Sequence, residues 1–272
     1  MMFWNINKDR ASEMQMNKLV TLGVAQVGFW AMLGMAQAAP EVATWVATET
    51  RQVDARVVRV RLDGVVDLRI RQGSTASLTL SGEPRWLART TTEQHGDTLN
   101  IDSDVQGRGH LGALRAELTL PALREVTSES LGSTEVSGFS GEELSVNLDG
   151  AGSMRISGNY RMVSASLGGI GSMQLQGLNS DGVALNLQGA GVVTLSGRAK
   201  WLKADLGGLG SLDAQQFNAD TVNIDLSGLG NARVTAHQNA NLNLSGLGSV
   251  TVYGKPLNRK VSVDGLGKVS WK

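Results

Sequence analysis

The 272-residue sequence lacks cysteine and has four prolines, and aromatic residues make up 4% of it. Without cysteine, neither a disulfide framework nor a thiolate ligand for a metal ion can form. The 25 basic and 25 acidic residues give a formal net charge of zero, so no strong field would attract nucleic acid. Glycine is abundant instead, at 34 residues, and this composition favours an all-β protein over a helical one.

A seven-residue pattern recurs between residues 131 and 272. It reads apolar, polar, apolar, any residue, Gly, any residue, Gly, as in LNLQGAG and LNLSGLG, and its copies follow one another at intervals of 18 to 20 residues. A fixed period of this kind indicates one structural unit per repeat. The glycine pairs are Gly150 and Gly152, Gly169 and Gly171, Gly189 and Gly191, Gly208 and Gly210, Gly228 and Gly230, Gly246 and Gly248, and Gly265 and Gly267.

Apolar and polar residues alternate on both sides of each glycine pair, which is typical of half-buried strands. The repeat region shows no helical periodicity, so crossover helices cannot link its strands and the chain must coil. We therefore predict a parallel β-helix with turns of about 20 residues, stacked roughly 4.8 Å apart. The pattern places four inward columns of apolar residues along it. Because glycine adopts positive φ without steric cost, we expect each pair to form a sharp corner.

The first 38 residues are typical of a secretory signal peptide. Lys18 precedes an apolar run at residues 19–35, and Ala36-Gln37-Ala38 is a small-x-small site, so we expect cleavage between Ala38 and Ala39. Met16 is a second candidate for the start, and a transmembrane anchor is the alternative reading. The absence of cysteine excludes a thiol-linked lipid anchor. We therefore expect an exported protein, in the periplasm, secreted or at the cell surface, without a lipid anchor.

Three segments follow the signal peptide. Residues 39–52 are expected to form a linker, residues 53–130 an irregular β cap, and residues 131–272 the regular repeats. We interpret the cap as the opening turns of the same β-helix, because terminal repeats often differ from the others. A separate small β domain is the alternative.

The repeated SGLGSV-type units, preceded by VRLDGVVDLRIRQG and LRAELTLPALREV, resemble a bacterial family called "putative auto-transporter adhesin, head GIN domain". The resemblance extends from about Val57 to Trp271. It implies a right-handed parallel β-helix, no established catalytic residues and a role in cell adhesion.

The candidates for a metal site are Asp205 and Asp225, predicted one turn apart in an outer column and roughly 5 Å from each other. With Asn186 and Asn243 beside them, they could supply oxygen ligands to Ca²⁺. The same column also fits a solvated polar ladder, which we favour. No two of the three histidines share a metal-ligand spacing; they are His95, His110 and His237. We therefore expect no cofactor and no catalytic residue.

The residue between the two glycines is apolar in every copy: Ala151, Ile170, Ala190, Leu209, Leu229, Leu247 and Leu266. We expect these side chains to point inward and complete the core. If they point outward, they form an apolar ridge for a partner or for self-association. The last repeat carries several basic residues, which either discourage pairing of its open strand edge with another chain or bind an anionic surface such as lipopolysaccharide. They are Lys255, Arg259, Lys260, Lys268 and Lys272.

These features favour a non-catalytic, exported β-helix that acts in adhesion or in contact with the cell envelope. Surface glycans, lipopolysaccharide or another envelope protein are the candidate partners. The alternatives are a carbohydrate-active enzyme, a polysaccharide-binding protein and a purely structural periplasmic protein. The aromatic residues do not line up in one column, which weakens the case for a long glycan groove.

Overall fold

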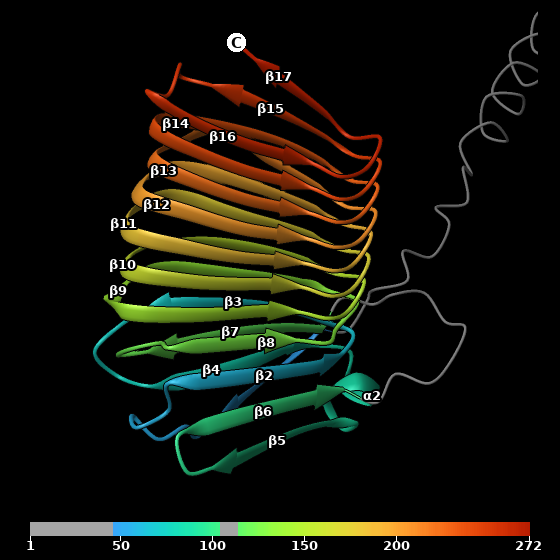
Figure 1. Cartoon of the computed structure of the whole chain (residues 1–272). Helices are drawn as coiled ribbons and strands as arrows, with labels where there is room; N and C mark the ends of the chain where they lie inside the picture. The colour runs from blue at the N-terminus through green and yellow to red at the C-terminus, as the bar shows by residue number, and fades with distance from the viewer. Residues whose placement is uncertain (1–45, 104–113) are drawn as a thin grey trace, which may run out of the picture. The chain divides into compact units, whose positions relative to one another are not determined.

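The computed structural model describes residues 46–103 and 114–272, which form one compact unit. Their strands join into a single 17-stranded sheet that winds into a β-solenoid of about seven turns (Figure 1). The prediction of an all-β repeat fold is confirmed. Within the described residues the helix is α2 (Pro84–Leu87). The expected signal peptide with Ala38 and Ala39, and His110, lie outside the described residues.

The strands fall into an irregular group and a regular one. The irregular group is β1 (Ala47–Arg51), β2 (Arg59–Gly64), β3 (Val66–Gln72), β4 (Ser77–Gly82), β5 (Thr90–His95), β6 (Thr98–Ser103), β7 (Leu114–Leu120) and β8 (Glu125–Ser128). The regular group is β9 (Ser133–Leu148), β10 (Ser153–Leu167), β11 (Ser172–Leu187), β12 (Val192–Leu206), β13 (Ser211–Leu226), β14 (Asn231–Leu244), β15 (Ser249–Tyr253), β16 (Asn258–Val263) and β17 (Lys268–Trp271).

Each turn from β9 to β14 is one long strand that bends once and ends at a glycine pair, whereas the following turn is divided into β15 and β16. Neighbouring turns pair in parallel and in register: Asn186 of β11 lies beside Asp205 of β12, which lies beside Asp225 of β13. Equivalent residues therefore stack turn upon turn, as the repeat predicts. The solenoid has two opposite edges, the glycine corners at the right of Figure 1 and the bends of the long strands at its left.

The paired positions at the corners are glycine for a different reason from the one expected. None of the paired glycines has positive φ; positive φ occurs instead near the bend, at Gly138, Gly177, Gly197 and Gly254. The expectation of left-handed backbone at the corners is therefore wrong. A Cβ on Gly189 would overlap the carbonyl oxygen of Gly169 on the preceding turn, and the amide of Ala190 donates to that same oxygen at 3.1 Å. Glycine is required because adjacent turns approach too closely for a side chain.

The core contains one more column than the sequence pattern predicted. Besides the four expected columns, a fifth is fully buried: Leu144, Val163, Val183, Leu202, Val222 and Ala240. Aromatic rings fill the bend, where Phe139, Tyr160 and Phe217 are all buried. The Tyr160 hydroxyl donates to the carbonyl of Leu123 at 2.9 Å, and burial raises the pKa of Tyr160 above its ordinary value.

The N-terminal strands share the core of the repeats, but they do not stack in chain order. β2 lies between β6 and β8, and β3 lies between β7 and β9, all in parallel. The first turn in the sequence is therefore inserted between two later ones. β4 and β5 pair antiparallel with β7 and β6, respectively. One continuous hydrophobic cluster includes residues of both groups, whereas two separate domains would each have a core of their own.

Five residues of the expected linker, residues 39–52, belong to the sheet instead. β1 pairs antiparallel with β4, and Arg51 Nη1 donates to the carbonyl of Thr90 at 2.7 Å. The linker prediction does not hold for Ala47–Arg51, because this strand covers the exposed edge of β4.

Candidate functional site

A hollow of about 590 Å³ lies on the outside of the bend, across several consecutive turns. Its floor is part of a buried column that includes Tyr160, Ser180 and Ala199. Ser180 donates its hydroxyl proton to the carbonyl of Tyr160 at 2.7 Å. The residues of this column face the core, whereas the side chains on either side of it face outward and form the two walls of the hollow. We call this feature the bend trough.

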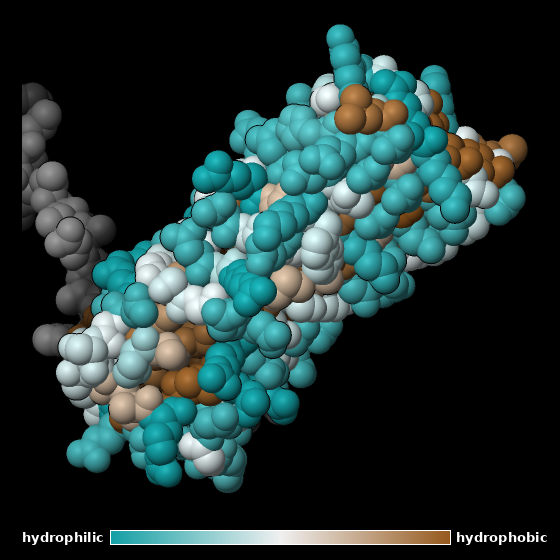
Figure 2. Space-filling model, turned by 60° about the vertical axis from the view of Figure 1, so that its left-hand side comes forward, coloured by the Kyte–Doolittle hydropathy of each residue, from teal (hydrophilic) through white to brown (hydrophobic). Residues whose placement is uncertain are grey.

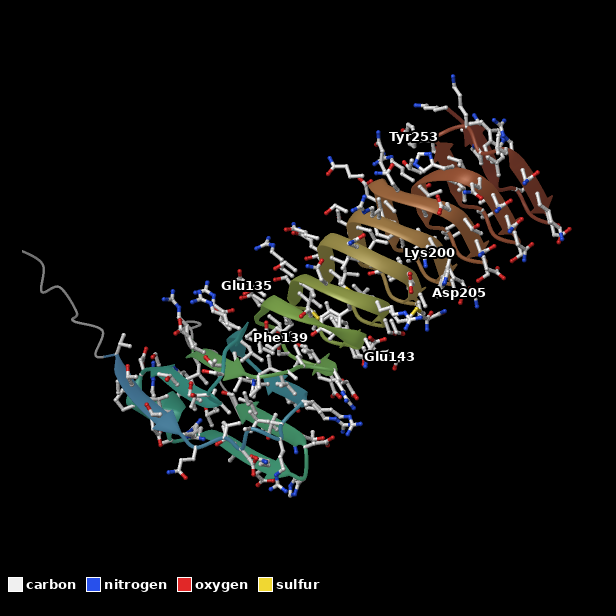
Figure 3. The ribbon with its side chains drawn as sticks, turned by 90° about the vertical axis from the view of Figure 1, so that its left-hand side faces the viewer. Glu135, Phe139, Glu143, Lys200, Asp205 and Tyr253 are labelled. Atoms are coloured by element: carbon white, nitrogen blue, oxygen red, sulfur yellow. The ribbon has the colours of Figure 1, made fainter. Side chains whose placement is uncertain are left out.

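One wall is an alternating charged ladder that consists of Glu142, Arg161, Asp181, Lys200 and Asp220. Arg161 contacts Glu142 at 3.2 Å and Asp181 at 2.7 Å, and Lys200 contacts Asp181 at 2.7 Å. Hydrogen bonds from Lys200 and Arg161 lower the pKa of Asp181, and bonds to Asp181 and Glu142 raise the pKa of Arg161. Both shifts favour the charged forms of Asp181 and Arg161. Figure 3 looks onto the bend and labels Lys200 there.

The other wall is a column that consists of Asn159, Asn179, Arg198 and Asn218, which we call the amide column, and His237 of the next turn contacts its end. Arg198 donates to the side-chain oxygen of Asn179 at 2.9 Å, and the His237 ring lies 3.2 Å from the corresponding oxygen of Asn218. All five side chains are exposed. The column offers several hydrogen-bond donors and acceptors at intervals of one turn, and the face around it is largely hydrophilic (Figure 2).

Trp201 lies next to Lys200 in the chain, at the outer side of the charged ladder. Its indole fills the space above Gly182 on the preceding turn, where any side chain would meet the ring atoms Cε2, Cζ2 and Nε1. The residue stays partly exposed. The bend thus presents an aromatic ring beside a row of charged and amide side chains.

The predicted neighbours Asp205 and Asp225 do lie one turn apart, on the sheet face beside the bend (Figure 3 labels Asp205). Lys203 contacts Asp205 at 3.4 Å, and Asn243 donates to Asp225 at 3.5 Å. Within the described residues, no three side chains of His, Asp or Glu gather around a position for a metal ion. These contacts fit the polar-ladder interpretation, and calcium binding there stays an untested prediction.

The residues between the paired glycines point outward, so the expectation that they complete the core is wrong. Ile170, Leu209, Leu229, Leu247 and Leu266 are each more than half exposed. The cause is the close stacking of the corner backbones, which leaves no interior space for a side chain there.

Sequence reasoning missed the charged ladder, although its signal is readable. Its residues recur at intervals of 19 and 20, the same intervals as the glycine pairs, and their charges alternate in sign. A search for charged residues at the repeat period would have found the ladder. The floor of the trough gives no comparable signal, since Ser and Ala are common throughout the chain.

The family comparison matches the chain over residues 58–256 to the model described as "Putative auto-transporter adhesin, head GIN domain". The chain belongs to the head GIN domain family. The resemblance seen in the sequence is thereby confirmed. No curated protein matches this GIN domain chain at a significant level.

Solved structures resemble this GIN domain chain along nearly their whole length. A "putative adhesin" from Parabacteroides distasonis ATCC 8503 shares 16% identity at a TM-score of 0.76, covering 85% of this chain and 98% of its own. A "putative adhesin" from Parabacteroides merdae ATCC 43184 shares 17% identity at a TM-score of 0.75, with 84% and 96% covered. A "putative lipid binding protein" from P. distasonis ATCC 8503 shares 17% identity at a TM-score of 0.73, with 82% and 96% covered. At these identities the likeness shows the fold.

None of the segments that the structure describes is a helix with the length and hydropathy required to cross a bilayer.

Proposed function

We propose that this protein is an exported, non-catalytic adhesin that binds a surface glycan along the bend trough. The observation that carries the proposal is the partly exposed indole of Trp201 at the outer side of the charged ladder, whose Lys200 lines the trough. Aromatic faces bind the apolar face of a sugar ring, while amides and charged groups bind its hydroxyls. The family description as an adhesin supports the same reading.

The periodicity of the trough suits a polymer better than a single small molecule. Its polar side chains repeat at each turn, roughly every 4.8 Å, so a chain of sugar units lying along the solenoid would meet similar groups at each step. Contacts of this kind are individually weak and add up along the chain. Asn179, Arg198 and Asn218 are exposed and could contact such a ligand.

The direct test is an array of bacterial and host surface polysaccharides probed with the purified protein. Trp201→Ala should weaken binding to any glycan retained by the wild type about tenfold, which corresponds to about 1.4 kcal/mol for one aromatic platform. The matched control is Trp271→Ala, which removes another partly exposed tryptophan on β17, several turns away from Trp201 on β12. Circular dichroism verifies that both variants are folded.

Unchanged binding by Trp201→Ala, or an equal loss in both variants, would move the glycan site away from the bend. Absence of binding to every glycan on the array would refute the proposed ligand class. Export is tested separately by cell fractionation with a C-terminal epitope. Recovery of the mature protein in the cytoplasm would contradict a role in adhesion.

A further inference from the structure

The glycine corners carry a straight row of exposed aliphatic side chains, which we call the corner ridge. Its large members are 53% to 84% exposed: Leu131, Ile170, Leu209, Leu229, Leu247 and Leu266. Ala151 and Ala190 occupy the equivalent positions of two other turns, and both are exposed. Backbone bonds between turns hold the row in place; for example, the amide of Leu209 donates to Gly189 and that of Leu229 to Gly208, both at 3.1 Å.

The ridge is large enough to form a stable interface. At the observed exposures, its six large residues expose on the order of 800 Å² in total, backbone included, which equals one partner's share of a standard-size interface if the whole row is buried. The corner segments from residues 168–172 to residues 245–249 read GGIGS, QGAGV, GGLGS, SGLGN and SGLGS, without a charged residue. The outer corners do carry charge, at Glu129, Asp149, Asp264 and Lys268. A single lysine along the ridge gives little attraction to anionic lipid headgroups.

The order of large and small residues favours one particular partner. From Leu131 to Leu266 the eight positions read Leu, Ala, Ile, Ala, Leu, Leu, Leu, Leu. If two identical ridges meet in opposite directions, Ala151 faces Leu247 and Ala190 faces Leu209, so each small residue receives a large one. If they meet in the same direction, alanine faces alanine and leaves two gaps. A second copy also has the same spacing between turns, so every position meets its counterpart.

We propose that the corner ridge is the interface of a two-fold symmetric homodimer in which the two solenoids lie antiparallel. Such an interface is isologous, because each copy contributes the same surface. The corners that carry the ridge lie on the opposite side of the solenoid from the bends of the long strands (Figure 1). The proposal does not depend on the glycan-binding function.

Sedimentation velocity of the protein expressed from the full chain tests the dimer over a wide range of concentration. We expect a dimer for the wild type, and at least tenfold weaker association (about 1.4 kcal/mol) for the double variant Leu209→Asp/Leu229→Asp. The matched control is Gln176→Asp/Gln216→Asp, which adds the same charges at two exposed glutamines away from the ridge and should remain dimeric. A wild type that is monomeric at every concentration would overturn the proposal.

Cross-linking gives a second test that does not depend on the folding of an aspartate variant. Because the chain has no cysteine, single Ala151→Cys and Leu247→Cys variants can be oxidised alone or mixed. The antiparallel dimer predicts disulfide-linked dimers in the mixture and none with either variant alone. Dimers from Ala151→Cys alone would indicate parallel ridges and overturn the arrangement.

A monomer that sediments with phosphatidylcholine vesicles, and loses this binding in the Leu209→Asp/Leu229→Asp variant, would assign the ridge to lipid instead.

Discussion

Replacement of Gly189 by alanine tests why the corners are built from glycine. The new Cβ would overlap the carbonyl oxygen of Gly169 and lie 2.8 Å from that of Gly168. All of these atoms are backbone, so no flexible side chain can move to make room. The corner must instead shift away from the preceding turn.

The cost of that shift follows from the bonds at the corner. The amides of Gly189 and Ala190 donate to Leu167 and Gly169 at 3.2 and 3.1 Å, and a shift would weaken both bonds. At about 1 kcal/mol for each bond and about 1–3 kcal/mol for the overpacking, we expect Gly189→Ala to lower the free energy of unfolding by about 4 kcal/mol.

The matched control is Gly177→Ala at the bend. Gly177 has φ +66°, and a Cβ there would meet no atom within 4 Å. Alanine at this position should therefore lower the free energy of unfolding only through the unfavourable left-handed backbone, by about 1–2 kcal/mol. Urea unfolding followed by circular dichroism measures both variants. A loss for Gly177→Ala as large as that for Gly189→Ala would refute the stacking argument and restore backbone conformation as the reason for the corner glycines.

Two further predictions concern the bend. Tyr160→Phe leaves the buried carbonyl of Leu123 without its donor and should cost about 1–2 kcal/mol in urea unfolding; an unchanged stability would mean that this bond contributes nothing. The lowered pKa of Asp181, caused first by its bond to Lys200, stabilises the fold above the ordinary pKa of 3.8, and this contribution is lost as the pH falls through the lower folded value. Asp181→Asn should therefore flatten the loss of stability below about pH 4, and a slope like that of the wild type would contradict the assignment.

The regular part of the fold was predictable because residues at equivalent positions of successive copies are neighbours in space. Leu187, Leu206 and Leu226 occupy equivalent positions in successive copies, and they are stacked neighbours in the structure. In most folds, residues 20 apart in sequence give no such information. Here the constant spacing places equivalent residues beside one another, so the register, four of the five core columns and the polar columns near the glycine pairs could be inferred.

The order of the N-terminal turns could not be inferred, since no repeat connects them. Nothing in the sequence of β6 indicates that Leu99 packs beside Val60 rather than beside the next strand along the chain. The pairing of β1 was missed for a similar reason. Its sequence, ATETR, has no apolar alternation, and it joins the sheet through backbone bonds that any sequence can make.

The two edges of the solenoid show how one backbone spacing gives opposite surfaces. At the corner, adjacent turns approach so closely that the paired positions must be glycine, and the residue between them has no room to point inward. Apolar side chains are therefore displayed rather than buried. At the bend, small residues such as Ala219 are buried while the polar columns beside them stay exposed.

Because these edges lie on opposite sides of each turn, association through the corner ridge would leave both bend troughs uncovered. In the antiparallel dimer the two troughs would face away from each other, toward two different surfaces. A dimer of this form could bridge two glycan-bearing surfaces, whereas a monomer could only bind one. Bridging needs no new contact, since linked sites gain from their effective concentration once the first is bound. The proposed dimer thus gives a physical reason why a solenoid with weak, repeated contacts on one edge would carry an apolar ridge on the other.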